Sequence, residues 1–227
     1  MNVRYTIVRL LTFKLRRDEM LQLNWRHFFA GLMGTWIVGM GRYWDHQNAT
    51  LLQHLGLGSI LYIFILAAFI WLMVKPYFVE DWNYFVVVTF IGLTSFPAIL
   101  YAVPVEKFFS ISTANTINGW FLVIVAFWRL RLLYYFLRKY TLLGDQYIFV
   151  IALMPICLII FTLSVLNLDR VVYDIMSGIE HPSANDSSYL ILWILSGLSA
   201  IVIIPLVLFY FYGIYTRSKE RKKKTNA

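Results

Sequence analysis

The residues that could do chemistry in this chain are few, and most of them lie between long apolar segments. Polar and charged side chains gather at the ends of these segments, as Arg42 does after the first and Asn118 does within the start of the fourth. Such side chains usually face a bundle interior or a water-filled cavity, although pairing with lipid headgroups is the alternative. Pairing at the headgroup level is the default interpretation, and the binding hypothesis is one polar pocket lined by Arg42, Asp45, Glu106, Asn115, Asn118, Asp169 and Arg170.

Metal binding is a second chemistry that the residue types allow. The same predicted loops hold Asp45, His46, His54, Glu180 and His181, and imidazole and carboxylate groups suit zinc and related ions. No pair of them has the spacing of a known metal motif, and three loops would have to converge. We therefore predict no metal site and no cofactor, and we expect these histidines in exposed loops.

Nucleophilic catalysis lacks the residues that it needs. Cys157 is the single cysteine and lies inside an apolar segment with no charged residue or histidine nearby, where a thiol is inert. Ser95 has no histidine predicted at its depth, and the glycine patterns that cradle phosphates are absent. The sequence identifies no catalytic residue, so a lipid-modifying enzyme is the weakest functional hypothesis.

The elements that must position these residues are membrane helices. Of the 227 residues 60% are hydrophobic and 14% are charged, against about 45–50% and 25% in soluble domains. A soluble domain of this size cannot bury so much apolar surface. The 41 aromatic residues exclude a disordered chain, and the lone cysteine excludes a disulfide scaffold. The composition predicts an all-α fold, a polytopic membrane helix bundle.

Six segments are long enough, or nearly so, to cross a hydrocarbon core that takes about 20 helical residues. The predicted spans are 27–41, 55–74, 84–103, 112–133, 147–166 and 189–212. The first has 15 residues and is about 22 Å long as a helix. Its small residues, such as Gly31 and Gly34, allow neighbouring backbones to approach, so we expect a packed interior helix.

The distribution of Lys and Arg decides between five spans and six. With six spans, 17 of the 20 lie on the side of the two termini, and only Arg42, Lys107 and Arg170 lie on the other side. With five spans the division is 9 against 11. Because cytoplasmic loops carry the excess of positive charge, the sequence predicts six spans, cytoplasmic N- and C-termini, and a predicted pocket on the outer side.

Three further segments complete the predicted organisation. Residues 1–26 form a basic cytoplasmic or interfacial segment ahead of the transmembrane domain 27–214, and residues 215–227 form a basic cytoplasmic tail. The outer segment 168–176 has the apolar periodicity of an amphipathic helix. We interpret the tail as an orientation anchor near anionic lipid, with nucleic-acid binding as the disfavoured alternative.

Two functions rank ahead of an enzyme. The first is a non-enzymatic membrane component that works with a membrane protein partner or a second copy of itself, which requires only the small-residue helix faces. The second is a small transporter or channel, which the proline-containing spans and the outer polar residues favour. We expect the bilayer and anionic lipids at the cytoplasmic face as partners, no nucleic acid, and a bacterial inner membrane, with a eukaryotic endomembrane as the alternative.

Overall fold

The computed structural model describes residues 2–44, 50–168 and 187–225. These residues form helices and connecting turns and contain no strand, which confirms the all-α prediction. Five helices are long and apolar enough to cross a membrane: Leu57–Tyr77, Tyr84–Ala102, Thr113–Thr141, Asp145–Val165 and Trp193–Lys223. The protein is therefore a multi-pass helical membrane protein. The predicted outer helix 168–176 lies, apart from its first residue, outside the described residues.

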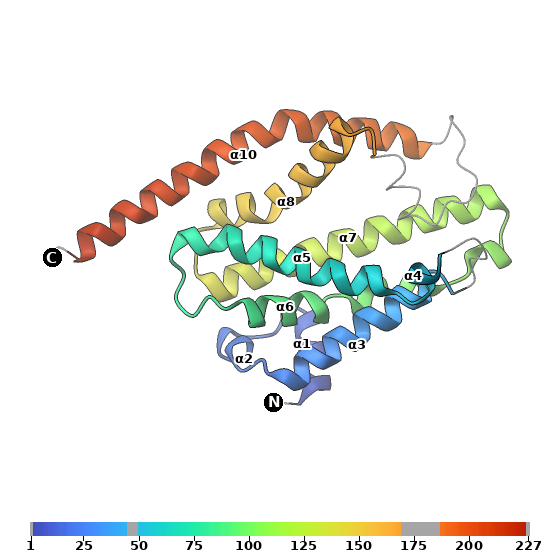
Figure 1. Ribbon diagram of the computed structural model, residues 1–227, viewed down its shortest axis with the longest axis horizontal. Helices are drawn as coiled ribbons and strands as arrows, with labels where there is room; N and C mark the ends of the chain where they lie inside the picture. The colour runs from blue at the N-terminus through green and yellow to red at the C-terminus, as the bar shows by residue number, and fades with distance from the viewer. Residues whose placement is uncertain (1, 45–49, 169–186, 226–227) are drawn as a thin grey trace. The chain divides into compact units, whose positions relative to one another are not determined.

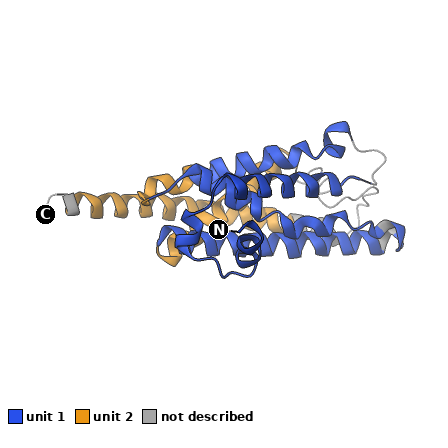
Figure 2. Cartoon of the chain, turned by 90° about the horizontal axis from the view of Figure 1, so that it is seen from below, with its two compact units in different colours: residues 1–71, 81–142 blue, residues 72–80, 143–227 orange. Residues whose placement is uncertain are grey.

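The chain divides into two compact units (Figure 2), which are residues 1–71 with 81–142 and residues 72–80 with 143–227. The α-helices of Figure 1 are α1 (Val3–Leu11), α2 (Arg17–Leu21), α3 (Trp25–Gly41), α4 (Leu51–His54), α5 (Leu57–Val74), α6 (Tyr84–Leu93), α7 (Ile111–Thr141), α8 (Asp145–Val165) and α10 (Ser187–Thr225). Short 3-10 helices are η1 (Lys75–Tyr77), η2 (Phe96–Ala102) and η3 (Val105–Lys107).

The core of unit 1 forms where α3 crosses α6. A Cβ atom on Gly31 would lie 2.9 Å from the backbone carbon of Gly92, so the two backbones touch. One turn further on, the Thr35 hydroxyl lies 2.9 Å from the Ser95 Oγ, and the Ser95 hydroxyl donates to the Gly92 carbonyl oxygen at 2.6 Å. Glycine makes the close approach possible, and the hydroxyls satisfy each other inside it.

The third predicted span, 84–103, is not one regular helix. The α-helix α6 ends at Leu93, and the chain continues as the 3-10 helix η2, which has Pro97 in its first turn. Proline has no N–H to donate and its ring obstructs the preceding turn. The hydroxyl of Thr94 donates to the Ile91 carbonyl oxygen at 2.8 Å, so side chains supply bonds where the regular backbone pattern ends.

The fourth predicted span, 112–133, is part of a longer helix. Helix α7 continues to Thr141 and ends where Leu142 takes a left-handed conformation with φ of 54°. Its last turns pack inside unit 1, where Phe136 stacks on Phe90 with ring centroids 4.0 Å apart. The Tyr140 hydroxyl donates to the Asp81 carbonyl oxygen at 2.6 Å. Aromatic packing therefore stabilises the part of α7 that extends beyond the predicted span 112–133.

Unit 2 is built on the pairing of α8 with α10. A Cβ on Gly213 would lie 2.8 Å from the ring of Tyr147, so these helices also meet at a glycine. The hydroxyls of Tyr77 and Tyr210 donate to the carbonyl oxygens of Tyr210 and Met73 at 3.2 and 2.9 Å. Helix α10 runs to Thr225, so the basic residues predicted as a separate tail from 215 onward continue the last helix.

Candidate functional site

The N-terminal segment is a folded lobe rather than a loose extension. Helix α1 packs against α3 and helix α2 packs against α7 (Figure 1), and Leu10, Leu15 and Met20 are at most 1% exposed. The turn after α1 places Phe13 in the left-handed region with φ of 59°, and its N–H donates to the Leu10 carbonyl oxygen. Glycine is usual at this position of a helix end, so the surrounding contacts must hold Phe13 there.

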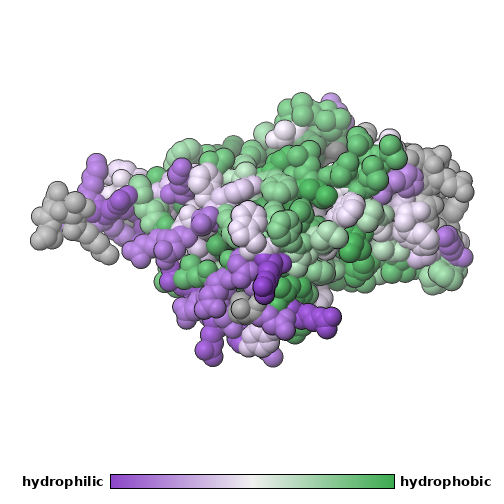
Figure 3. Space-filling model, turned by 60° about the horizontal axis from the view of Figure 1, so that its bottom comes forward, coloured by the Kyte–Doolittle hydropathy of each residue, from purple (hydrophilic) through white to green (hydrophobic). Residues whose placement is uncertain are grey.

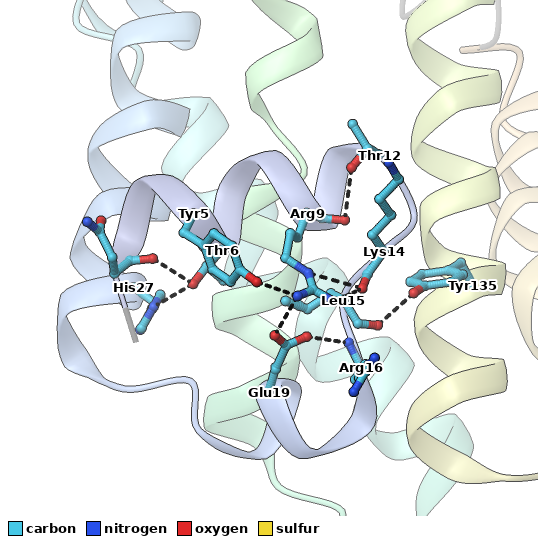
Figure 4. Close-up of polar contacts among 11 residues, drawn as sticks. Tyr5, Thr6, Arg9, Thr12, Lys14, Leu15, Arg16, Glu19, His27 and Tyr135 are labelled. Carbon is cyan, nitrogen blue, oxygen red and sulfur yellow. Dashed lines mark hydrogen bonds and ion pairs between the residues drawn. The ribbon is translucent and has the colours of Figure 1, made fainter.

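Arg9 contacts three other residues of this lobe (Figure 4). Its guanidinium donates to the Lys14 carbonyl oxygen at 2.7 Å and to the Tyr5 hydroxyl, and it lies 3.1 Å from the Glu19 carboxylate. The other Glu19 oxygen accepts the Arg16 N–H at 2.7 Å. The Tyr5 hydroxyl and the Glu19 charge raise the pKa of Arg9. The linker from α1 to α2 is thereby fixed at both ends.

A buried histidine ties the lobe to α3. His27 is fully buried, and its Nε2 lies 3.0 Å from the Thr6 hydroxyl. The Thr6 hydroxyl also donates to the Asn2 carbonyl oxygen at 3.0 Å, and the His27 Nδ1 lies 2.9 Å from the Asn24 Oδ1. The sequence places His27 only at the start of the first predicted span. The hydrogen-bond network gives it a structural role, which is to join α1 to α3.

Helix α7 receives the lobe on its other side. The Tyr135 hydroxyl donates to the Leu15 carbonyl oxygen at 2.6 Å, and the Trp128 ring N–H donates to the Leu11 carbonyl oxygen at 3.3 Å. Arg17 of α2 donates to the Tyr140 carbonyl oxygen at 3.2 Å. That bond satisfies an acceptor in the last turn of α7, where intrahelical donors run out. The lobe is therefore fastened to α7 along three turns.

Two basic pockets lie where the lobe meets α7. The linker pocket, of about 610 Å³, is lined by Arg9, Phe13, Lys14, Leu15, Arg16, Arg17, Tyr135 and Lys139. The α7 pocket, of about 440 Å³, is lined by Phe13, Arg131, Tyr134, Tyr135, Arg138 and Lys139. Lys139, Phe13 and Tyr135 border both pockets. Neither lining includes an acidic side chain among the described residues, so both pockets favour an anion.

Hydrophilic residues also gather over the N-terminal lobe in the space-filling view (Figure 3). Two of the lobe's cations have acidic partners, because Arg9 lies beside Glu19 and Arg17 lies 3.5 Å from Asp81. Within the described parts of the chain, Lys14, Arg16 and Lys139 form no ion pair. Their positive charge is therefore available to a ligand that enters the linker pocket.

The sequence predicts these cations as topology markers and as neighbours of anionic lipid at the cytoplasmic face, but not as the lining of a pocket. The signal that could have found the site is the spacing of Arg131, Tyr135 and Arg138, because residues at i, i+4 and i+7 share one helix face. Two cations and a hydroxyl on one face of a membrane helix indicate a polar contact with another segment. The partner segment, residues 12–17, is recognisable only once the chain has folded back.

The predicted outer pocket falls partly outside the described residues. Asp45, Asp169 and Arg170 lie outside them, and for Glu106 the structure describes the backbone within η3 but no side-chain position. Arg42 is half-buried at the end of α3, with its guanidinium over the rings of Tyr43 and Tyr101 at 5.6 and 5.2 Å. The half-buried Asn115 and Asn118 lie in the first turns of α7. The pocket is still a prediction.

The other candidate residues have structural surroundings where the structure describes them. Ser95 is buried and hydrogen-bonded between α3 and α6, and Cys157 is half-buried in α8. Across residues 2–44, 50–168 and 187–225, no three His, Cys, Asp or Glu side chains lie close enough together to hold a metal ion. His46, Glu180 and His181 lie outside these ranges.

Comparison of the chain with protein-family models, with curated proteins and with solved structures finds no match.

Proposed function

We propose that the protein is a non-enzymatic, six-span membrane component that holds its basic N-terminal lobe against the anionic cytoplasmic leaflet and works there with a membrane protein partner or a second copy of itself. The observation that carries the proposal is the fastening of this lobe to the end of α7 by the Tyr135 and Arg17 hydrogen bonds. A bacterial inner membrane suits this arrangement, since its inner leaflet carries anionic lipid.

Helix α3 supplies the sixth span in this proposal. Its 17 residues make a helix of about 26 Å, somewhat shorter than the core of about 30 Å. Phe29, Met33 and Ile37 are each about half exposed and recur every fourth residue, so they form one apolar stripe. The opposite face holds Gly31 and Thr35 against α6. One packed face and one apolar exposed face are typical of a helix beside lipid.

The cytoplasmic placement of the lobe follows from its charge. Residues 1–26 contain six Lys and Arg and two acids, and four more cations follow between residues 129 and 139. Cationic segments next to a membrane helix favour the cytoplasmic side, and each adds about 1 kcal/mol of attraction to an anionic leaflet. Both termini lie in the cytoplasm if α3 crosses.

Hydrogen exchange in lipid nanodiscs tests the contact with anionic lipid. We expect the amides of residues 3–21 to exchange more slowly in discs containing phosphatidylglycerol than in discs of phosphatidylcholine alone. About 1 M salt, which shortens the screening length to about 3 Å, should abolish the difference. Equal exchange in both discs would contradict the proposed contact.

The partner is tested by the mass of the complex. Native mass spectrometry of the protein released from its own membrane should show a species heavier than the 26.7 kDa chain. A spectrum with only the single chain, under conditions that preserve a known membrane complex, would remove this half of the proposal.

A further inference from the structure

We propose that the linker pocket is a built binding site for a phosphomonoester or pyrophosphate group, with Lys14, Arg16 and Lys139 as its cationic contacts. The inference deepens the proposed function, because it assigns a defined ligand chemistry to a lobe that otherwise attracts lipid through its overall charge. It depends on that proposal only for a lipid as the source of the phosphate.

The charges around the pocket favour an anion with more than one negative charge. Five cations border the linker pocket, and Glu19 and Asp81 neutralise two of them, Arg9 and Arg17. Three positive charges are left for a ligand. A phosphodiester carries one negative charge, whereas a phosphomonoester carries about 1.5 to 2 near pH 7. The dianion therefore gains more here.

The backbone between the cations is fixed before any ligand arrives. Arg9 binds the Lys14 carbonyl oxygen, Glu19 accepts the Arg16 N–H, and Tyr135 binds the Leu15 carbonyl oxygen. Three successive linker residues are thus held by three different side chains (Figure 4). Pre-organisation of this kind lowers the ordering cost of binding, and it distinguishes a site from a mobile basic segment.

The walls of the pocket suit the apolar portion of a phosphorylated ligand. Phe13 and Tyr135 pack edge to face with ring centroids 5.8 Å apart, and the guanidinium of Arg131 lies 5.4 Å from the Phe13 ring. Both rings border the α7 pocket as well. A ligand with its phosphate at Lys139 therefore has an aromatic surface for the adjoining carbon chain.

Binding to the full chain in detergent micelles tests the site. The probes are dioctanoyl phosphatidic acid, dioctanoyl phosphatidylglycerol with a single charge, neutral dioctanoyl glycerol and inorganic pyrophosphate. We expect phosphatidic acid to bind more tightly than the two other lipids. The double variant K14Q/K139Q should weaken that binding by about tenfold or more, because two charge-assisted hydrogen bonds are lost. Both lysines are exposed, so the variant should fold.

The matched control is R4Q/R26Q, which removes two exposed cations of the N-terminal region that do not line the linker pocket. It should leave the affinity for phosphatidic acid nearly unchanged. Displacement of phosphatidic acid by an equal concentration of pyrophosphate assigns the site to a soluble phosphate, whereas resistance to displacement assigns it to a lipid headgroup. Either result supports the phosphate chemistry.

Two results would overturn the inference. The first is phosphatidylglycerol binding as tightly as phosphatidic acid, because the pocket would then have no preference for a dianion. The second is an equal loss in the pocket variant and in the control. That outcome would leave the proposed function in place, since diffuse charge would hold the lobe at the leaflet. Failure of the nanodisc experiment alone would instead remove the lipid contact.

Discussion

Gly31 and Gly92 lie backbone against backbone where α3 crosses α6. The nearest backbone atoms of the other helix would lie 2.9 Å from a Cβ on Gly31 and 3.2 Å from a Cβ on Gly92. Backbone atoms cannot move aside as a flexible side chain can, so this crossing fixes the separation of the two helices. It also sets the position of the N-terminal lobe, which is joined to the start of α3 by the His27–Thr6 hydrogen bond.

We predict that Gly31→Ala destabilises the protein by about 1–3 kcal/mol, the usual cost of adding a group to a filled contact. The matched control is Gly58→Ala on α5, where an added Cβ meets nothing within 4 Å. That change should be neutral or slightly stabilising, because alanine favours helix. Unfolding in mixed micelles provides the measurement, and equal stability of the two variants would mean that α3 and α6 do not touch.

The second prediction concerns the number of spans. Single cysteines at Asn48 and Gly144, introduced into a Cys157→Ala background, should react with an impermeant maleimide from opposite sides of the membrane. The reason is the concentration of 17 of the 20 Lys and Arg on one side in the six-span arrangement. Labelling of both positions from the same side would mean that α3 does not cross.

Composition and apolar run length were enough to predict the fold class, because a chain with 60% hydrophobic residues has no soluble alternative. The sequence also predicts that the fourth helix continues through Arg129–Tyr140, as α7 does, but it does not predict the break after Leu93. The break depends on how Thr94 and Ser95 redirect their hydroxyls around Pro97, and the extension depends on packing such as Phe136 on Phe90. A hydropathy profile records neither the hydrogen bonds of Thr94 and Ser95 nor the packing of Phe136 on Phe90.

The candidate site escaped sequence reasoning for a related reason. The sequence marks Lys14 and Lys139 as cations, but they are 125 positions apart. Their meeting requires the fold-back of the lobe and the bond from Tyr135 to the Leu15 carbonyl oxygen. The sequence around Leu15 does not indicate that its carbonyl oxygen accepts a hydrogen bond from a side chain of α7. The sequence gives the number of cations, but it does not show which of them come together in the folded chain.

The third prediction tests that bond directly. Tyr135→Phe should cost about 1 kcal/mol, the typical net value of one hydrogen bond, and should speed hydrogen exchange in residues 12–16 more than elsewhere. Tyr215→Phe is the control, because Tyr215 is 66% exposed and lies on α10. A uniform increase in exchange over the whole chain would show that Tyr135 supports global stability rather than the linker.

The fourth prediction concerns the outer polar pocket. If Arg42 lies in that pocket, Arg42→Gln should couple energetically with neutralisation of at least one acid among Asp45, Glu106 and Asp169. Double-mutant cycles of stability should then give about 0.5–3 kcal/mol of coupling. Arg42→Gln with Tyr101→Leu is the reference cycle, because the cation lies over that ring. Coupling to Tyr101 alone would remove the main support for a transporter.

The last prediction separates the stability of the lobe from its binding. Phe13 occupies the left-handed region at φ of 59°, which costs a non-glycine residue about 1 kcal/mol or more. Phe13→Gly relieves this strain but loses the edge-to-face contact with Tyr135, worth about 0.5–1.5 kcal/mol. The two effects nearly cancel, so the free energy of unfolding should change by less than about 1 kcal/mol. Binding of dioctanoyl phosphatidic acid should nevertheless weaken, because the aromatic wall is gone.

Phe78→Gly is the matched control, since Phe78 has φ of 54° and lies outside both pocket linings. It should relieve similar strain and leave binding unchanged. Unaltered binding in Phe13→Gly would show that the ring is only a packing element of the turn.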